Sequence, residues 1–156
     1  MTDYNKIEIV KNIITELLEK CGVNANVEFE ESITKGLVFN ISSNDSFLLI
    51  GRQGATLHSV QILVQALASK KLQSPEPFWF TLDVDDYKRK REWFLKETAK
   101  AAFDKAKMTG RAQGLEPMPN YERRLVHAYL QEHCPEADSF SVGNDPYRKV
   151  VIRTKR

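Results

Sequence analysis

The chain has 156 residues, of which 42% are hydrophobic and 28% charged, a composition that supports a packed core and argues against intrinsic disorder. The net charge of +2 is too small by itself to indicate nucleic-acid binding, but residues 1–86 carry 7 basic and 12 acidic side chains whereas residues 87–156 carry 16 and 9. No apolar run approaches the roughly 20 residues that cross a bilayer, and the N-terminus has no signal-peptide pattern. We therefore expect a cytoplasmic protein without membrane insertion.

The first half of the chain predicts helices interspersed with short strands. A first helix precedes strands at residues 27–31 and 37–41, a short helix, a glycine loop at 50–54, a long helix and a strand at 78–84. Both long helices carry apolar residues at helical spacing, and we expect Cys21 to lie on the buried side of the first helix. These residues are Ile7, Val10, Ile14, Leu17, Leu18 and Cys21 in the first helix and Leu57, Val60, Val64, Leu67 and Ala68 in the second.

The loop Gly51-Arg52-Gln53-Gly54 is the first candidate binding site. Glycine has no Cβ, so we expect another chain's backbone to approach these positions closely. The loop also opens a helix, whose free N–H groups and positive dipole end attract phosphate. A purely structural turn is the alternative interpretation.

This order of elements resembles the minimal KH domain, and the additional elements on its N-terminal side are typical of the prokaryotic, type II version. The resemblance implies that the glycine loop clamps about four nucleotides of single-stranded RNA or DNA.

A long helix is predicted from Asp85 to Met108, with Tyr87, Phe94, Thr98, Ala101 and Ala102 toward a core. The basic run at residues 88–91 fits a solvated face or an RNA-facing ridge equally well. The irregular segment 110–119 is the predicted domain boundary.

A second motif lies on a predicted helix that begins at Asn120, where Arg123 and His127 are one turn apart. We expect both on a polar face together with Arg124. A guanidinium binds phosphate bidentately and an imidazole stacks on a base, although a solvated face is the alternative. The Arg-x-x-x-His spacing resembles the small single-stranded nucleic-acid-binding module named for it. A hairpin at 137–142 and 147–154 adds Arg148 and Lys149.

Catalytic and metal-binding patterns are not recognisable. The adjacent acids Glu30-Glu31 and Asp85-Asp86 fit solvated or capping roles, and the three histidines have no metal-ligand spacing. The two cysteines form no Cys-x-x-Cys pair and are expected to be reduced thiols. We therefore expect no enzyme activity, no cofactor and no metal.

Four stretches together resemble the bacterial Jag family, the SpoIIIJ-associated proteins also called KhpB or EloR. They are residues 50–57, 82–84 with the basic residues that follow, 121–127 and 146–152. The resemblance implies a cytoplasmic single-stranded RNA-binding protein, with single-stranded DNA as a further ligand. It also implies a second small KH protein as partner and a regulatory link to cell elongation, shape or envelope synthesis. The alternative function is a scaffold that docks a partner protein or a ribosomal surface.

The predicted fold class is α+β, an α/β sandwich. We expect a type II KH domain at residues 1–86 with a three-stranded sheet backed by helices, a connecting helix at 87–109, and a small α+β Arg-x-x-x-His domain at 110–156 that ends in a hairpin. The predicted RNA-binding residues are Gly51, Arg52, Gln53, Gly54, Arg123, Arg124, His127, Arg148 and Lys149.

Overall fold

The computed structural model describes residues 4–155, and the chain divides between Lys88 and Arg89 into a first and a second unit. The first unit contains α1 (Tyr4–Lys20), β1 (Ala25–Ser32), β2 (Gly36–Ser43), α2 (Ser46–Ile50), a 3-10 turn (Arg52–Gly54), α3 (Ala55–Leu72) and β3 (Thr81–Val84). The second unit contains most of α4 (Tyr87–Thr109), then β4 (Gln113–Gly114), α5 (Asn120–His133), β5 (Ala137–Val142) and β6 (Lys149–Thr154). The α+β fold class is confirmed.

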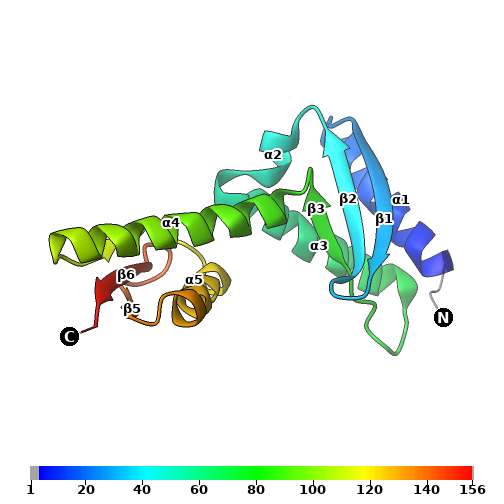
Figure 1. The fold of residues 1–156 in the computed structure, drawn as a ribbon. Helices are drawn as coiled ribbons and strands as arrows, with labels where there is room; N and C mark the ends of the chain where they lie inside the picture. The colour runs from blue at the N-terminus through cyan, green and yellow to red at the C-terminus, as the bar shows by residue number, and fades with distance from the viewer. Residues whose placement is uncertain (1–3, 156) are drawn as a thin grey trace. The chain divides into compact units, whose positions relative to one another are not determined.

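In the first unit a three-stranded sheet lies against two helices. The strand order is β1-β2-β3, with β1 antiparallel and β3 parallel to β2. Figure 1 shows α1 and α3 on one side of this sheet. Side chains from both layers form one core, which includes Ile7, Val10, Ile14, Phe39, Ile41, Leu57, Val64, Leu82 and Val84.

Two predictions for the first unit are wrong in detail. The last strand begins at Thr81 instead of Phe78. The backbone carbonyls before it accept hydrogen bonds from side chains of α3 and not from a neighbouring strand. Gln65 donates to the carbonyl of Phe78, and Gln61 donates to that of Phe80. Cys21 is exposed, since α1 ends at Lys20 and the chain turns away.

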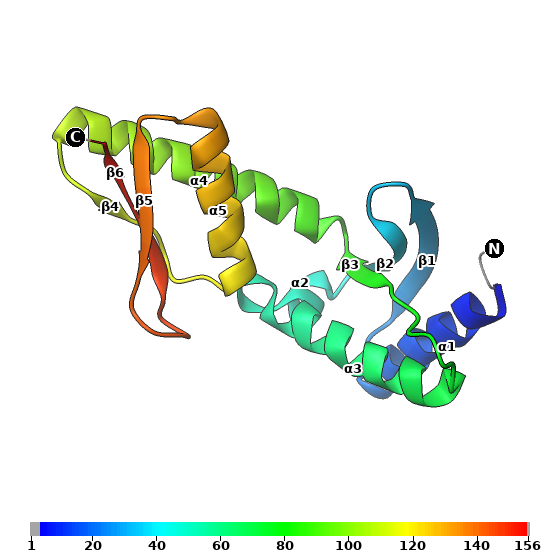
Figure 2. The same ribbon diagram turned by 90° about the horizontal axis from the view of Figure 1, so that it is seen from below.

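In the second unit α4 and α5 pack against an antiparallel sheet of order β4-β6-β5. Figure 2 shows this sheet crossing α4, with α5 beside β5. The core includes Leu95, Ala99, Phe103, Val126, Leu130, Val150 and Ile152. The helix that we predicted as a connector therefore contributes one wall of this core.

The buried face of α4 differs from the predicted one by about one residue. Leu95, Ala99, Phe103 and Ala106 are buried, whereas Phe94 is 51% exposed. The buried set repeats every three or four residues, so it forms a continuous stripe. The sequence interpretation placed Phe94 in the core because its side chain is aromatic, and this shifted the predicted buried stripe by one position. Between residues 4 and 155, none of the helices combines the length and apolar character needed to cross a bilayer.

A buried ion pair joins α4 to α5. The carboxylate of Glu122 is fully buried and accepts two hydrogen bonds of 2.9 Å from Nε and Nη2 of Arg91. Bidentate guanidinium–carboxylate pairs are strong and directional. Arg91 therefore has a structural partner and does not form part of a uniformly solvated basic face.

We predict that Glu122→Ala destabilises the second unit by about 3 kcal/mol, because removal of one member of a buried pair leaves the other charge uncompensated. Hydrogen exchange at the amides of Val126 and Ile152 measures this locally. The control is Glu92→Ala, which removes an exposed i,i+4 pair with Lys96 and is expected to cost less than about 0.5 kcal/mol. Equal effects of the two substitutions would contradict the assigned role of Glu122.

Candidate nucleic-acid interface

The glycine loop adopts a backbone that requires glycine at both ends. Gly51 has φ +69° and ψ −172°, a region essentially restricted to glycine, and Gly54 has φ +79°. A Cβ on Gly51 would collide with the hydroxyl of Thr56 and lie 2.9 Å from its backbone nitrogen. A Cβ on Gly54 would lie 2.7 Å from Cε1 of Tyr87. The space that a side chain would fill is thus occupied by the protein itself.

The reason that we expected for the glycines is therefore wrong. They do not leave an open Cβ position for a second chain; they allow the loop to fold tightly over Thr56 and Tyr87. What the loop offers instead is the side chain of Arg52, which is exposed, and that of Gln53, which is half-buried with φ +53°.

The helix after the loop presents its N-terminus without a side-chain cap. Gly54 is the N-cap residue of α3, and it cannot supply a side-chain hydrogen bond to the first turn. Backbone N–H groups at such a helix end attract anions through direct hydrogen bonds and the helix dipole. Arg52 lies in the turn before it, so the loop can bind a phosphate by backbone and by charge.

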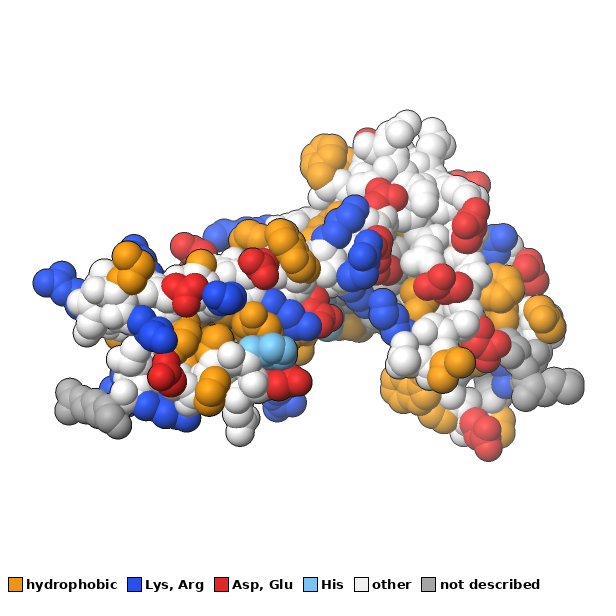
Figure 3. Space-filling model, in the orientation of Figure 1, with side chains coloured by type: hydrophobic (Ala, Val, Ile, Leu, Met, Phe, Trp, Pro, Cys, Tyr) orange, Lys and Arg blue, Asp and Glu red, His pale blue; other side chains and the backbone are white. Residues whose placement is uncertain are grey.

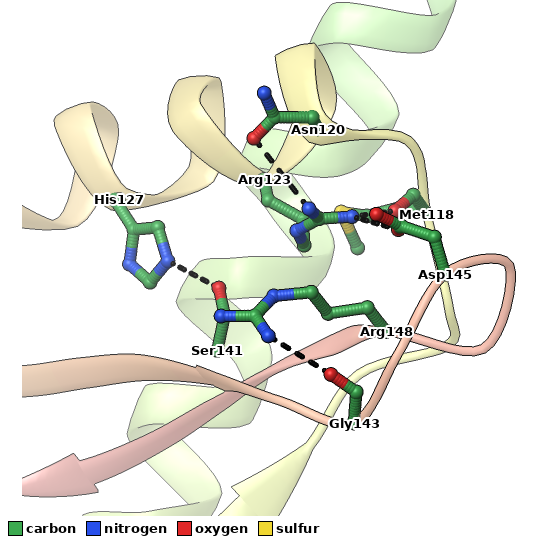
Figure 4. Close-up of polar contacts among 8 residues, drawn as sticks. All are labelled: Met118, Asn120, Arg123, His127, Ser141, Gly143, Asp145 and Arg148. Atoms are coloured by element: carbon green, nitrogen blue, oxygen red, sulfur yellow. Dashed lines mark hydrogen bonds and ion pairs between the residues drawn. The ribbon is translucent and has the colours of Figure 1, made fainter.

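Arg123 is buried, although the sequence placed it on a polar helix face. Its side chain is 6% exposed, and Nη1 donates to the carbonyl of Met118 at 2.8 Å and to Oδ1 of Asp145 at 2.9 Å (Figure 4). Nη2 is 3.5 Å from the side-chain oxygen of Asn120. The core face of α5 is centred on Val126, which leaves Arg123 at its edge.

Asp145 differs from Arg123 in being largely exposed, with 69% of its side chain accessible. It lies in the turn between β5 and β6, so the pair ties this turn to the start of α5. A buried guanidinium thus has an accessible carboxylate as one of its partners. Phosphate oxygens bind a guanidinium in the same way as carboxylate oxygens do.

His127 is one turn further along α5 and bonds to two serines of β5. Its Nδ1 is 2.7 Å from the hydroxyl of Ser139, and its Nε2 is 3.0 Å from that of Ser141. Partial burial lowers the pKa of His127, and the charge of Arg123 lowers it further. The imidazole is therefore neutral at pH 7, and the serines fix its orientation.

Of the remaining predicted residues, Arg148 and Lys149 lie toward opposite faces of the β4-β6-β5 sheet, and Arg124 lies on α5. Arg148 comes directly before Lys149, so alternation along the strand places it on the His127 side, and its Nη1 donates to the carbonyl of Gly143 at 2.9 Å (Figure 4). Lys149 is paired with Val142 in the register of β6 and β5, on the opposite face. Arg124 is exposed on α5. We call Arg123, His127 and Arg148, with Asp145, the arginine–histidine cluster.

Sequence reasoning missed Asp145, Ser139 and Ser141. Both serines alternate with outward residues of β5 and therefore face α5, where polar side chains need partners. The alternation of these serines along β5 can be seen in the sequence, and it indicates a polar contact with α5. Pairing of Asp145 with Arg123 spans 22 positions and had no local sequence pattern.

The surface charge follows the asymmetry in the sequence. Figure 3 shows Lys and Arg side chains spread over the second unit, while Asp and Glu are more frequent on the first. Basic side chains in the second unit are interspersed with exposed apolar ones. Such a surface attracts polyanions without being uniformly basic.

Comparison with known families supports both assignments. Residues 7–76 match the family model described as "KhpA/KhpB, KH domain", and residues 94–154 match the family model of the domain named for its Arg-x-x-x-His motif. The first match contains the glycine loop and the second contains the arginine–histidine cluster. The second match begins inside α4, in agreement with the packing of this helix in the second unit.

Curated relatives carry one name throughout. The chain is 37% identical over 138 residues to RNA-binding protein KhpB of Clostridium symbiosum, which covers 86% of this chain and 59% of the relative. It is 31% identical over 140 residues to the protein of the same name from Lactiplantibacillus plantarum, covering 90% of this chain and 42% of the relative. In Bacillus subtilis the identity is 28% over 151 residues, with coverage of 96% and 71%. The chain thus spans about half the length of the first two relatives. With both of its domain types matched and with curated relatives that share one name, this chain belongs to the KhpB family, also known as Jag.

Proposed function

We propose that this protein binds single-stranded RNA, at the glycine loop of the first unit and at the arginine–histidine cluster of the second. The observation that carries the proposal is the buried guanidinium of Arg123, which is held at 2.9 Å by an exposed carboxylate. The name shared by the curated relatives, RNA-binding protein, supports the same conclusion. Single-stranded DNA, which offers the same phosphates and unstacked bases, is a further ligand.

At the arginine–histidine cluster, we infer that a phosphate of the RNA takes the place of Asp145 on Arg123. The carbonyl of Met118 continues to orient the guanidinium. Arg148 lies on the same side of the sheet and adds a second positive charge. Neutral His127, with its ring fixed by two serines, is suited to stacking or hydrogen bonding with a base or sugar. Arg124, exposed on the same helix, attracts the strand electrostatically.

At the glycine loop, a second phosphate binds the N–H groups at the start of α3, and Arg52 and Gln53 contact the flanking backbone. At the loop the phosphate is bound by backbone N–H dipoles and by one cation, Arg52. The second unit supplies several cations. Because phosphate contacts position a strand while base contacts specify sequence, we expect modest sequence preference and strong salt dependence.

Several further features belong to this proposal. The KH-type functional domain is proposed to span residues 1–86, followed by the connecting helix at 87–109, which also packs in the core of the second unit, and by the Arg-x-x-x-His domain at 110–156. The protein acts in the cytoplasm as a post-transcriptional regulator without enzyme activity. A link to cell elongation, shape or envelope synthesis follows from the family resemblance.

A second small KH protein is the proposed partner. The family model that the first unit matches, "KhpA/KhpB, KH domain", names a second protein, KhpA, beside KhpB, and this supports a partner of that kind. The exposed apolar side chains of Ile62, Leu63 and Leu67 on α3 offer a surface for it. A helix with apolar residues all round is normally covered.

We predict that Arg52→Asp combined with Gln53→Asp weakens binding to a single-stranded RNA by roughly tenfold, through repulsion at the helix N-terminus. Aspartate tolerates the left-handed backbone at position 53, so folding is retained. The matched control is Lys71→Asp with Gln73→Asp, which changes the charge equally at the other end of α3 and also replaces a left-handed glutamine. Fluorescence anisotropy measures both. Unchanged affinity of the loop variant, or equal losses in both, would contradict the loop assignment.

We predict that Asp145→Asn tightens RNA binding by about fivefold, because it removes a charge that competes with phosphate and is worth roughly 1 kcal/mol. Asparagine keeps an oxygen that accepts from Arg123, so the turn is preserved. Arg123→Ala is a poorer test, since it leaves a buried position without its polar contacts.

The control for Asp145→Asn is Asp104→Asn, which removes the same charge from an exposed pair with Lys100 on α4. It is expected to leave the affinity within twofold of wild type. If the two variants bind RNA equally well, Asp145 does not compete with phosphate.

A further inference from the structure

The β4-β6-β5 sheet has a second face that the arginine–histidine cluster does not use. Ser139, Ser141, Val150 and Ile152 point toward α5 and the core. The alternate positions of the two strands point the other way, in register pairs. These pairs are Asp138 with Arg153, Phe140 with Val151, and Val142 with Lys149, and we call them the outer sheet face.

The outer sheet face has an aromatic residue at its centre. Phe140 is 37% exposed, and the half-buried side chain of Val151 lies directly opposite it. Outward positions of a sheet covered on one side are usually polar. Here an apolar pair lies between two cations, as is found where bases stack on the exposed rings of a sheet.

Cations occupy both ends of the outward row of β6. Arg153 donates to Asp138 at 2.7 Å, and its guanidinium carbon is 5.0 Å from the centre of the Phe140 ring. At the other end, a Cβ on Gly114 would lie 3.4 Å from Nζ of Lys149, so Lys149 extends across β4 where glycine leaves room. The four intervening strand steps separate the two cations by about 13 Å. Asp138, the acid among these register pairs, is compensated by Arg153.

We propose that the outer sheet face is a nucleobase-stacking subsite for single-stranded RNA. A base stacks on Phe140 beside the Arg153 guanidinium, and the phosphates on either side of that base contact Lys149 and Arg153. This inference rests on the proposed function and extends it to residues outside the arginine–histidine cluster.

The dimensions favour a polynucleotide over a protein. A six-residue strand is about 20 Å long, and two strands side by side are about 10 Å wide. The resulting area of roughly 200 Å² is well below the roughly 800 Å² that each partner buries in a stable protein interface. It is large enough for a few nucleotides. Because β5 is an edge strand, an RNA that also occupies the arginine–histidine cluster passes around this edge.

The test compares Phe140→Ala with Phe29→Ala, which removes an equally exposed ring, 38% against 37%, from the sheet of the first unit. The ligand is a single-stranded oligouridylate long enough to reach both faces. We expect Phe140→Ala to weaken binding by at least about fivefold. Phe29→Ala is expected to bind as wild type, and Phe140→Trp, which keeps a stacking ring, is expected to bind more tightly than Phe140→Ala. Circular dichroism checks that each variant folds.

Crosslinking distinguishes failure of the subsite from failure of the proposed function. With 5-bromouridine in the oligonucleotide, ultraviolet irradiation is expected to attach the wild-type protein to RNA through the peptide that contains Phe140. If wild type binds but Phe140→Ala binds equally well and this peptide is not labelled, the subsite is wrong while RNA binding stands. If wild type binds no single-stranded RNA, the proposed function itself fails. Lys149→Glu provides an independent variant on this face, and wild-type affinity for it would also overturn the subsite.

Discussion

Two consecutive charged residues at the start of α5, both buried, are the constraint on which the second unit depends. Glu122 points toward α4 and binds Arg91, while Arg123 binds the carbonyl of Met118 and Asp145 in the turn after β5. A buried charge costs several kcal/mol unless it is paired with good geometry. Each residue therefore fixes one side of α5. The orientation that results places His127 against the serines of β5.

The two proposed RNA contacts use different physics. The glycine loop offers a helix N-terminus, for which an exposed site provides about 0.3–1 kcal/mol per interaction with an anion. The arginine–histidine cluster offers guanidinium groups, whose hydrogen bonds to charged acceptors are worth about 1.5–3 kcal/mol. Affinity should thus come mainly from the second unit. The loop contributes position and strand geometry, for which backbone N–H groups are well suited.

The pattern of the sequence was sufficient for the order of the helices, for every strand except β4 in the segment predicted to be irregular, and for the glycine loop and the Arg-x-x-x-His helix. It was insufficient where long-range polar contacts override local periodicity. Charged residues are normally exposed, so Arg123 was assigned to the polar arc of α5, yet its partner 22 residues away keeps it buried. The start of β3 was misplaced for a similar reason, since two glutamines of α3 bond to the chain before it. The sequence identified the glycine loop, but the reason that it needs glycine is close contact with Thr56 and Tyr87, which is visible only in the structure.

The central claim is that RNA phosphate replaces Asp145 on a guanidinium that the fold has already positioned. Nuclear magnetic resonance of the arginine Nε–Hε groups and aspartate carboxyl carbons, during titration with a single-stranded oligouridylate, tests it most directly. The account predicts that the signals of Arg123 and Asp145 shift together as RNA binds, while Arg91, held by buried Glu122, remains unchanged and serves as an internal control. RNA binding that leaves the signals of Arg123 and Asp145 at their free positions would contradict it.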